Sequence, residues 1–361
     1  MSKRHYIIPL FVPHEGCPHN CVFCNQNSIT GYQEKVTAST VHQTVKEYFK
    51  TIDADDNIVE ISFFGGTFTA IPVDKQIELL SAAKHYKDKG LINFIRLSTR
   101  PDYIDDEILT RLKHYSVDII ELGLQSMDND VLRMAGRGHN RADTINASIK
   151  IKEYGFILGH QIMLGLPGDN IKKDLETAYA SIALKPDLCR IYPALVLKDT
   201  PMELMYNRGS YKPYSLQEAI EITKKLFCIY TYHGVNIIRV GLQATDNITE
   251  GRDIITGPYH PAFRELVEGS LICDMIRDEI QNFTESIKLF INSRYISRLY
   301  ANKKMFFYDM KRHITSNNLN VFIDNSLENG LIRFEYEDRC WIVSIFDYIS
   351  KSVKAGKSYS I

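Results

Sequence analysis

The chain has 361 residues, of which 44% are hydrophobic and 24% are charged, and 43 basic residues nearly balance 44 acidic ones. This composition is typical of a globular protein with one large domain and a smaller one. The net charge of −1 excludes the global basic bias of many nucleic-acid-binding proteins and leaves a local basic face open. No apolar run reaches the roughly 18–20 residues of a membrane span, so we expect no membrane association.

The cysteine content argues against a secreted protein. Seven cysteines are an odd number, and three of them fall within eight residues, which is not typical of a disulfide framework. The N-terminal run MSKRHYIIPLFVP is short and lacks a small-residue cleavage site. We therefore predict a reducing, cytoplasmic location.

Short apolar runs alternate with helix-like segments through the first two-thirds of the chain. The predicted strands are Tyr6–Val12, Val59–Phe64, Phe94–Ser98, Asp118–Leu124, Ile157–Leu164 and Leu188–Tyr192. The predicted helices are Thr40–Thr51, Val73–Lys89, Asp105–His114, Arg141–Tyr154 and Ile171–Leu184. Repeated βα units imply a parallel sheet, and six of them are too few for a closed eight-stranded barrel. We predict an α/β fold, a partial (β/α)6 barrel.

The regular alternation of strands and helices ends after Gly257. A helix is predicted over Pro261–Ile280 and another near Lys303–Ser316. The predicted strands of this region are Ile287–Ile291, Leu319–Ile323, Leu331–Phe334 and Trp341–Ile345. We therefore expect a core domain over residues 1–257 and a small α+β C-terminal domain over residues 258–361.

Cys17, Cys21 and Cys24 form a C-x3-C-x2-C motif directly after the first predicted strand. Thiolates are soft ligands that suit iron–sulfur clusters. Three of them can hold three irons of a cubane, which leaves the fourth iron open for the amine and carboxylate of a molecule such as S-adenosylmethionine (SAM). The alternative is structural zinc with His14 or His19 as fourth ligand, but no second Cys pair follows at zinc-finger spacing.

Polar and glycine residues follow the later strands at the edge where ligands of such sheets bind. The candidate ligand-binding residues are Gly65, Gly66, Thr67, Ser98, Gln125 and Arg137. A Gly-Gly pair lets a ligand approach the backbone closely, Gln125 can bind a ribose hydroxyl, and Arg137 can pair with a carboxylate. The alternatives are a tight turn for the glycines and a surface salt bridge for Arg137.

The segments CPHNCVFC, FFGGTFT, STRPD, ELGLQS and GRGH, in this order, resemble the radical SAM superfamily. The pattern is most similar to the radical SAM core of the Elongator catalytic subunit and its bacterial relatives, over roughly residues 6–271. The resemblance implies a [4Fe–4S] cluster on the three cysteines and reductive cleavage of SAM to a 5′-deoxyadenosyl radical. It also implies that residues 65–67 hold the methionyl end of SAM. Oxygen-independent coproporphyrinogen oxidase is a more distant relative, in which residues spaced like Gln125 and Arg137 contact SAM.

Two departures limit the resemblance. Elongator-type proteins often have Glu where this chain has Ser98, which puts a ribose contact of Ser98 in doubt. The Elongator subunit also continues into an acetyltransferase domain that binds acetyl-CoA. The residues after Leu271 contain no R/Q-x-x-G-x-G/A loop, which would hold the pyrophosphate of such a ligand. The complete Elongator route is therefore not expected of this chain alone.

The resemblance implies tRNA as substrate, a reductant such as flavodoxin or ferredoxin, and an anaerobic setting, because such a reduced cluster is oxygen-sensitive. A second hypothesis is a small molecule such as a porphyrin-like carboxylate, or a peptide, which the neutral net charge favours over RNA. A third is a non-catalytic RNA-binding or scaffold protein with a cluster or zinc kept for structure. The sequence names no catalytic residue and leaves the oligomeric state open.

Overall fold

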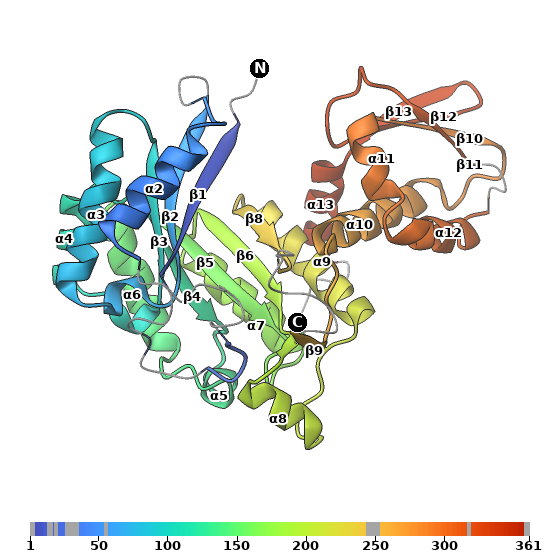
Figure 1. Ribbon diagram of the computed structural model, residues 1–361. Helices are drawn as coiled ribbons and strands as arrows, with labels where there is room; N and C mark the ends of the chain where they lie inside the picture. Colours follow the sequence, from blue (N-terminus) through green and yellow to red (C-terminus); the bar gives the residue numbers. More distant parts are fainter. Residues whose placement is uncertain are drawn as a thin grey trace. The chain divides into compact units, whose positions relative to one another are not determined.

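The computed structural model describes residues 4–12, 17, 21–25, 36–53, 57–242, 253–315 and 319–356. The chain divides into two compact units, and Figure 1 traces the elements of both. The first unit comprises Met1–Pro213 and Gln243–Gly257, and the second comprises Tyr214–Leu242 and Pro258–Ile361. The predicted division into domains at residue 257 stays a prediction, because the division into compact units does not show which part of the chain folds independently. No helix within the described ranges is long and apolar enough to cross a membrane.

The first unit contains six parallel strands in chain order. They are β1 (His5–Val12), β2 (Ile58–Gly65), β3 (Phe94–Thr99), β4 (Ile119–Gln125), β5 (Ile157–Leu164) and β6 (Leu188–Pro193). Between them lie α2 (Ala38–Tyr48), α3 (Val73–Asp88), α4 (Asp106–His114), α5 (Asn129–Met134), α6 (Arg141–Glu153) and α7 (Ile171–Ala183). The unit also holds α8 (Pro201–Asn207) and the antiparallel pair β7 (Val196–Leu197) and β9 (Ile254–Thr256). The expected fold class, a partial (β/α)6 barrel followed by a small α+β region, is confirmed.

The two faces of this sheet differ in chemistry because successive side chains of a strand point to opposite faces. One face is apolar: Ile61 and Phe63 of β2 belong to a core with Leu79 of α3 and Leu109 of α4. In Figure 1 these helices lie on the same side of the strands. The alternate positions of β2, β3 and β4 carry Glu60, Arg96 and Glu121, which form the other face.

Local sequence signals explain where the helices begin and end. Asn140 caps α6, and a reciprocal hydrogen bond from the Asn140 N–H to the Asp143 side chain completes a capping box. Gly90 and Gly155 follow α3 and α6 with φ of +70° and +72°, which is the left-handed conformation expected after a helix. These residues therefore fix the start of α6 and the ends of α3 and α6.

The second unit combines helices with a four-stranded sheet. Its helices are α9 (Leu216–Tyr232), α10 (Phe263–Ile280), α11 (Ser293–Leu299), α12 (Met305–Arg312) and α13 (Ile345–Lys354), and it includes the strand β8 (Asn236–Val240). The sheet has the order β11 (Leu319–Ile323), β10 (Ile287–Ile291), β12 (Leu331–Tyr336) and β13 (Arg339–Ser344). Strands β10 and β11 are parallel and the other neighbours are antiparallel. Ile276 of α10, Met310 of α12 and Phe334 of β12 share its core.

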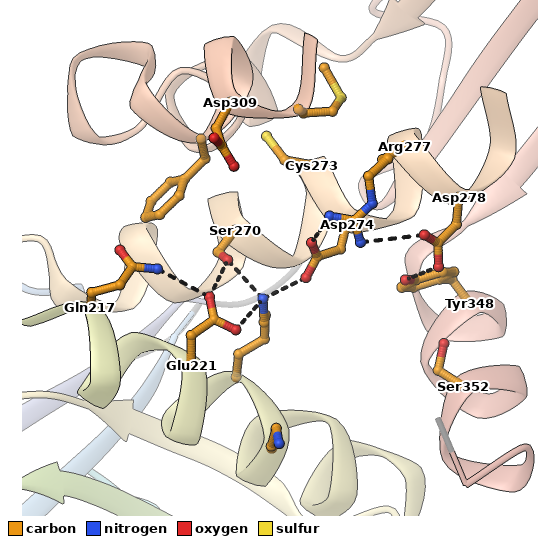
Figure 2. A pocket seen from close by; sticks show the side chains of 14 residues that line it. Gln217, Glu221, Ser270, Cys273, Asp274, Arg277, Asp278, Asp309, Tyr348 and Ser352 are labelled. Atoms are coloured by element: carbon orange, nitrogen blue, oxygen red, sulfur yellow. Dashed lines mark hydrogen bonds and ion pairs between the residues drawn. The ribbon is translucent and has the colours of Figure 1, made fainter. Parts of the chain in front are cut away.

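A polar cavity of about 490 Å³ lies between helices of this unit. Figure 2 shows a ladder of alternating charges along its wall. Lys224 of α9 bonds to Glu221 at 2.9 Å and to Asp274 of α10. Arg277 then bonds to Asp274 at 3.0 Å, and Tyr348 of α13 donates to Asp278 at 2.9 Å. Since these charges are satisfied by one another, the ladder links three helices.

Candidate functional site

The cysteine loop follows β1 at the carboxyl edge of the first sheet. Cys21 is buried and Cys17 and Cys24 are partly exposed; all seven cysteines of the chain lie in the described ranges, and none forms a disulfide. The Cys24 N–H donates to the Cys21 carbonyl at 3.0 Å, and the Val22 N–H donates to the Ala135 carbonyl at 3.0 Å, which anchors the loop beside α5.

The described thiols do not form a closed metal-binding geometry. Among the residues that the structure describes, no three His, Cys, Asp or Glu side chains stand together so as to hold a metal ion. Residues 18–20, which join Cys17 to Cys21, lie outside the described residues, as do His14 and His19, the alternative zinc ligands. The ligand role of the cysteines therefore stays a prediction.

The tip of β2 lies against both β1 and the first cysteine. Thr67 Oγ1 is 3.1 Å from Cys17 Sγ, and the Gly66 N–H donates to the Val12 carbonyl at 3.0 Å. Gly65 has a φ of +114°, and a Cβ at this position would lie 2.4 Å from the Val12 oxygen. Only glycine fits there, so the predicted Gly-Gly-Thr segment is held in one conformation next to Cys17.

Gly65→Ala is expected to lower the free energy of unfolding by about 2–3 kcal/mol, because alanine would be strained at this φ and its Cβ would meet backbone. Urea unfolding measures this loss. Gly90→Ala is the matched control: Gly90 also has a left-handed φ, but no atom lies within 4 Å of the new Cβ, so we expect a loss of about 1 kcal/mol. Equal losses in the two variants would contradict the close approach of β1 and β2.

Arg137 connects the cysteine loop to strand β4. Its Nη1 donates to Cys21 Sγ at 3.2 Å and its Nη2 donates to the Gly123 carbonyl at 2.6 Å. Its Nε is buried and has no hydrogen-bond partner among the described residues. An unsatisfied buried N–H is costly, so this atom is suited to an acceptor that a bound ligand would supply.

Gln125 lies beside Arg137 at the end of β4. Its φ is +63°, an uncommon conformation for a non-glycine residue, and the register of β4 with β5 shifts just before it. A Cβ on Gly123 would lie 2.9 Å from Gln125 Nε2 and 3.5 Å from Arg137 Nη2. The structure therefore brings Gln125, Arg137 and Cys21 to one edge of the sheet, with Gly123 leaving room between them.

Ser98 lies deeper along its strand than these residues. Its Oγ donates to Glu121 Oε2 at 3.3 Å, and Ser98 pairs in register with Glu121, four residues before Gln125. The structure joins Ser98 to a buried charged network, and its predicted contact with ribose stays a prediction.

This charged network is the feature that the sequence analysis missed. Arg96 bonds to Glu60 at 2.7 Å and to Glu121, and Arg190 bonds to Glu121 at 3.0 Å and to Tyr192 at 3.3 Å. Glu60, Arg96 and Glu121 are almost fully buried. Burial alone would raise the pKa of Glu60, but a hydrogen bond with His5 and the charge of Arg96 hold it below its ordinary value. The sequence did contain a signal for this network, because charged residues stand at alternate positions of three otherwise apolar strands.

Two histidines of this unit, His139 and His160, are buried and neutral. His160 bonds to Ser148 at 3.0 Å and to Ser181 at 2.8 Å, which joins β5 to helices α6 and α7. His139 lies 3.2 Å from the Leu124 carbonyl. Burial lowers the pKa of each to about 3. These contacts give His160 a structural role.

The carboxyl group of Asp169, in the loop after β5, should make the stability of the protein depend on pH. Burial raises its pKa to about 6, despite a hydrogen bond with Asp174. Between about pH 4 and 6 the folded state retains a proton that the unfolded state releases, so stability falls as pH rises and stays lower above pH 6. Asp169→Asn should therefore raise the free energy of unfolding at pH 7 by about 1–3 kcal/mol and flatten this slope. Thermal unfolding across pH measures it, and an Asn variant that is less stable at pH 7 would contradict it.

Comparison with known proteins identifies the family. Residues 11–179 match the family model of the radical SAM superfamily, and residues 186–272 match that of the radical SAM C-terminal domain. The chain belongs to the radical SAM superfamily. It is therefore a radical SAM enzyme, and the cofactors of this superfamily are SAM and a [4Fe–4S] cluster.

The relatives include proteins that act on tRNA. The chain is 28% identical to a tRNA uridine(34) acetyltransferase of Methanocaldococcus jannaschii over 60% of this chain and 47% of the relative. It is 26% identical to Elongator complex protein 3 of Bos taurus over 60% and 48%. An uncharacterized protein of M. jannaschii is 28% identical over 65% of this chain and 74% of its own length. The chain thus spans about half the length of the acetyltransferase and Elongator relatives.

A solved structure supports the fold. The archaeal Methanocaldococcus infernus Elp3 with an N-terminal deletion aligns with a TM-score of 0.62 and 22% identity, over 76% of this chain and 64% of that one. The predicted resemblance to the radical SAM core of the Elongator subunit is confirmed by these relatives.

Proposed function

We propose that Cys17, Cys21 and Cys24 hold the [4Fe–4S] cluster of this radical SAM enzyme. Three reduced thiols on one loop are the donor set that such a cluster requires. Thr67 and Arg137 each lie within hydrogen-bonding distance of a thiol. Such hydrogen bonds to sulfur tune the potential of a bound cluster, and this pairing supports the assignment.

SAM would bind at the same edge of the sheet. Gly65, Gly66 and Thr67 would hold its methionyl end, Gln125 and Arg137 its ribose or carboxylate, and Ser98 is the further ribose candidate. When bound, the cluster and SAM would supply radical chemistry, in which a hydrogen atom is abstracted from the substrate. The unsatisfied Nε of Arg137 supports a ligand with acceptor oxygens here.

The protein's own side chains would hold this site rigid. Arg137 fixes Cys21 relative to Gly123, and the Val12–Gly66 hydrogen bond fixes the glycine tip relative to Cys17. The ion pairs of Glu60, Arg96 and Glu121 fill the charged face of the sheet with groups that bond to one another. A preorganised site of this kind spends little energy on rearrangement when its ligands bind.

The substrate we propose is tRNA, and the observation that carries this proposal is the similarity across the core to tRNA uridine(34) acetyltransferases. A flavodoxin or ferredoxin would deliver the electron. Because the chain spans about half of those relatives, we propose the radical step on tRNA and not their whole reaction.

The test compares SAM cleavage by the reconstituted enzyme with intact tRNA, with the same tRNA digested to nucleosides, and with no addition. We expect intact tRNA to increase 5′-deoxyadenosine formation and to gain a mass change at one nucleoside. Equal product in all three samples, with no modified nucleoside, would overturn the tRNA assignment and leave the radical SAM chemistry intact.

A further inference from the structure

The four-stranded sheet of the second unit has one face in the core and one face outside it. Leu289, Phe334 and Val343 point into the core. The alternate positions form a row across all four strands, because Phe322 pairs with Phe290, Phe290 with Arg333, and Arg333 with Ile342. The outer face therefore carries an aromatic–aromatic–arginine–aliphatic row, which we call the outer row.

The π-systems of the outer row are aligned. The rings of Phe290 and Phe322 are stacked, with centroids 5.2 Å apart and planes 24° apart. The Arg333 guanidinium lies 4.1 Å from the centre of the Phe290 ring, and ion pairs with Asp324 and Glu335 hold it there. Phe322 is 43% exposed and Ile342 is 54% exposed. Apolar side chains that gather in one exposed row commonly mark an interaction site.

We propose that the outer row binds single-stranded RNA by stacking bases on Phe322 and on the neighbouring planar groups. Aromatic rings displayed on an open sheet face are a recurring way to bind unpaired bases. The charged side chains described at this face are Lys288, Arg333, Glu335 and, just after β11, Asp324, and their charges sum to zero. Each of the two cations pairs with a carboxylate, so the face does not repel a phosphate backbone but holds its described cations in ion pairs. Binding should therefore depend more on stacking than on phosphate contacts, and salt should weaken it only slightly.

This platform goes beyond the catalytic site. Residues 273–361 lie beyond the matched family models, which end at residue 272, so the platform lies in the part of the second unit that these models do not cover. The choice of RNA over other polymers rests on the proposed function, in which part of the same RNA is the substrate. A protein partner or a second copy of this chain is the competing occupant, and the test below separates these cases.

The experiment measures the affinity of the full chain for a labelled single-stranded oligouridine by fluorescence anisotropy. Phe322→Ala should weaken binding about five- to tenfold or more, because one stacked base is lost. Phe322→Leu should weaken binding similarly, since leucine keeps apolar area but has no π-face, whereas Phe322→Tyr should retain the affinity.

Tyr308→Ala on α12 is the matched control. It removes an aromatic side chain that is 57% exposed and whose neighbour Phe307 packs in the core. The log–log salt slope should be no steeper than about −1, as expected for at most one phosphate contact.

Three results would overturn the proposal. One is an absence of oligouridine binding by the wild type, and another is wild-type affinity in Phe322→Leu, which would indicate apolar docking and not base stacking. The third is a light-scattering result in which Phe322→Ala converts a dimer to a monomer without changing RNA affinity. SAM cleavage without substrate should be the same in wild type and Phe322→Ala, so failure of the platform and failure of the radical SAM assignment are distinguishable.

Discussion

Arg96→Met is expected to lower the free energy of unfolding by about 3–5 kcal/mol, because it removes one partner from a buried ion-pair network. Glu60 has no exposed side-chain surface and would lose its guanidinium partner, and Glu121 would keep Arg190 as its cationic partner. Urea unfolding of the cluster-free protein at neutral pH measures the loss. The difference from wild type should narrow in acid, where protonation of Glu60 removes its need for a cation.

Lys50→Met is the control for this experiment. Lys50 pairs with Glu47 on the surface, where both side chains are two-thirds exposed, so its loss should cost less than about 1 kcal/mol. If Arg96→Met costs no more than Lys50→Met, the network does not stabilise the sheet as its burial implies.

Arg137→Ala is expected to reduce 5′-deoxyadenosine formation by about ten- to 150-fold while the protein stays folded. A hydrogen bond to a charged group contributes about 1.5–3 kcal/mol, which corresponds to that range of rates. Arg137 donates to the thiol of Cys21, and its buried Nε, which has no partner among the described residues, would be available to the proposed ligand. The loss should therefore appear as a weaker affinity for SAM and as a shift in the midpoint potential of the cluster.

The matched control is Arg133→Ala, four residues earlier in the chain, in α5. Arg133 forms an exposed pair with Asp130, so its removal should leave SAM affinity, potential and product unchanged. A folded Arg137→Ala enzyme with wild-type SAM affinity and potential would contradict the role of Arg137 in binding.

The strands of the first unit could be predicted from sequence because each is a short apolar run bounded by turn residues. All six predicted strands agree with the structure within one residue at either end. The helix Leu216–Tyr232 was not predicted, although Ser215 and Glu218 form a capping box at its start. The short helix Ser293–Leu299 was also not predicted, because seven residues show too few helical turns for a clear hydrophobic periodicity.

The location of the candidate site could be predicted from the sequence, but the contacts between its side chains could not. Strand ends can be read from sequence, so the positions of Cys17, Gly65 and Gln125 at one edge follow from the order of parallel strands. Which side chains meet there cannot be read in this way. The contact of Arg137 with Cys21 spans 116 positions of sequence. The charged network joins four strands; the sequence shows charged residues within these apolar strands but does not show which of them pair.

We propose that the three cysteines hold a cluster that cleaves SAM. The most direct measurement is 5′-deoxyadenosine formation after anaerobic reconstitution and dithionite reduction, with iron content determined beside it for wild type and Cys24→Ala. We expect the wild type to bind about four irons per chain and to form product, and the variant to form none. Zinc in place of iron after anaerobic purification, or equal product in both proteins, would contradict the account.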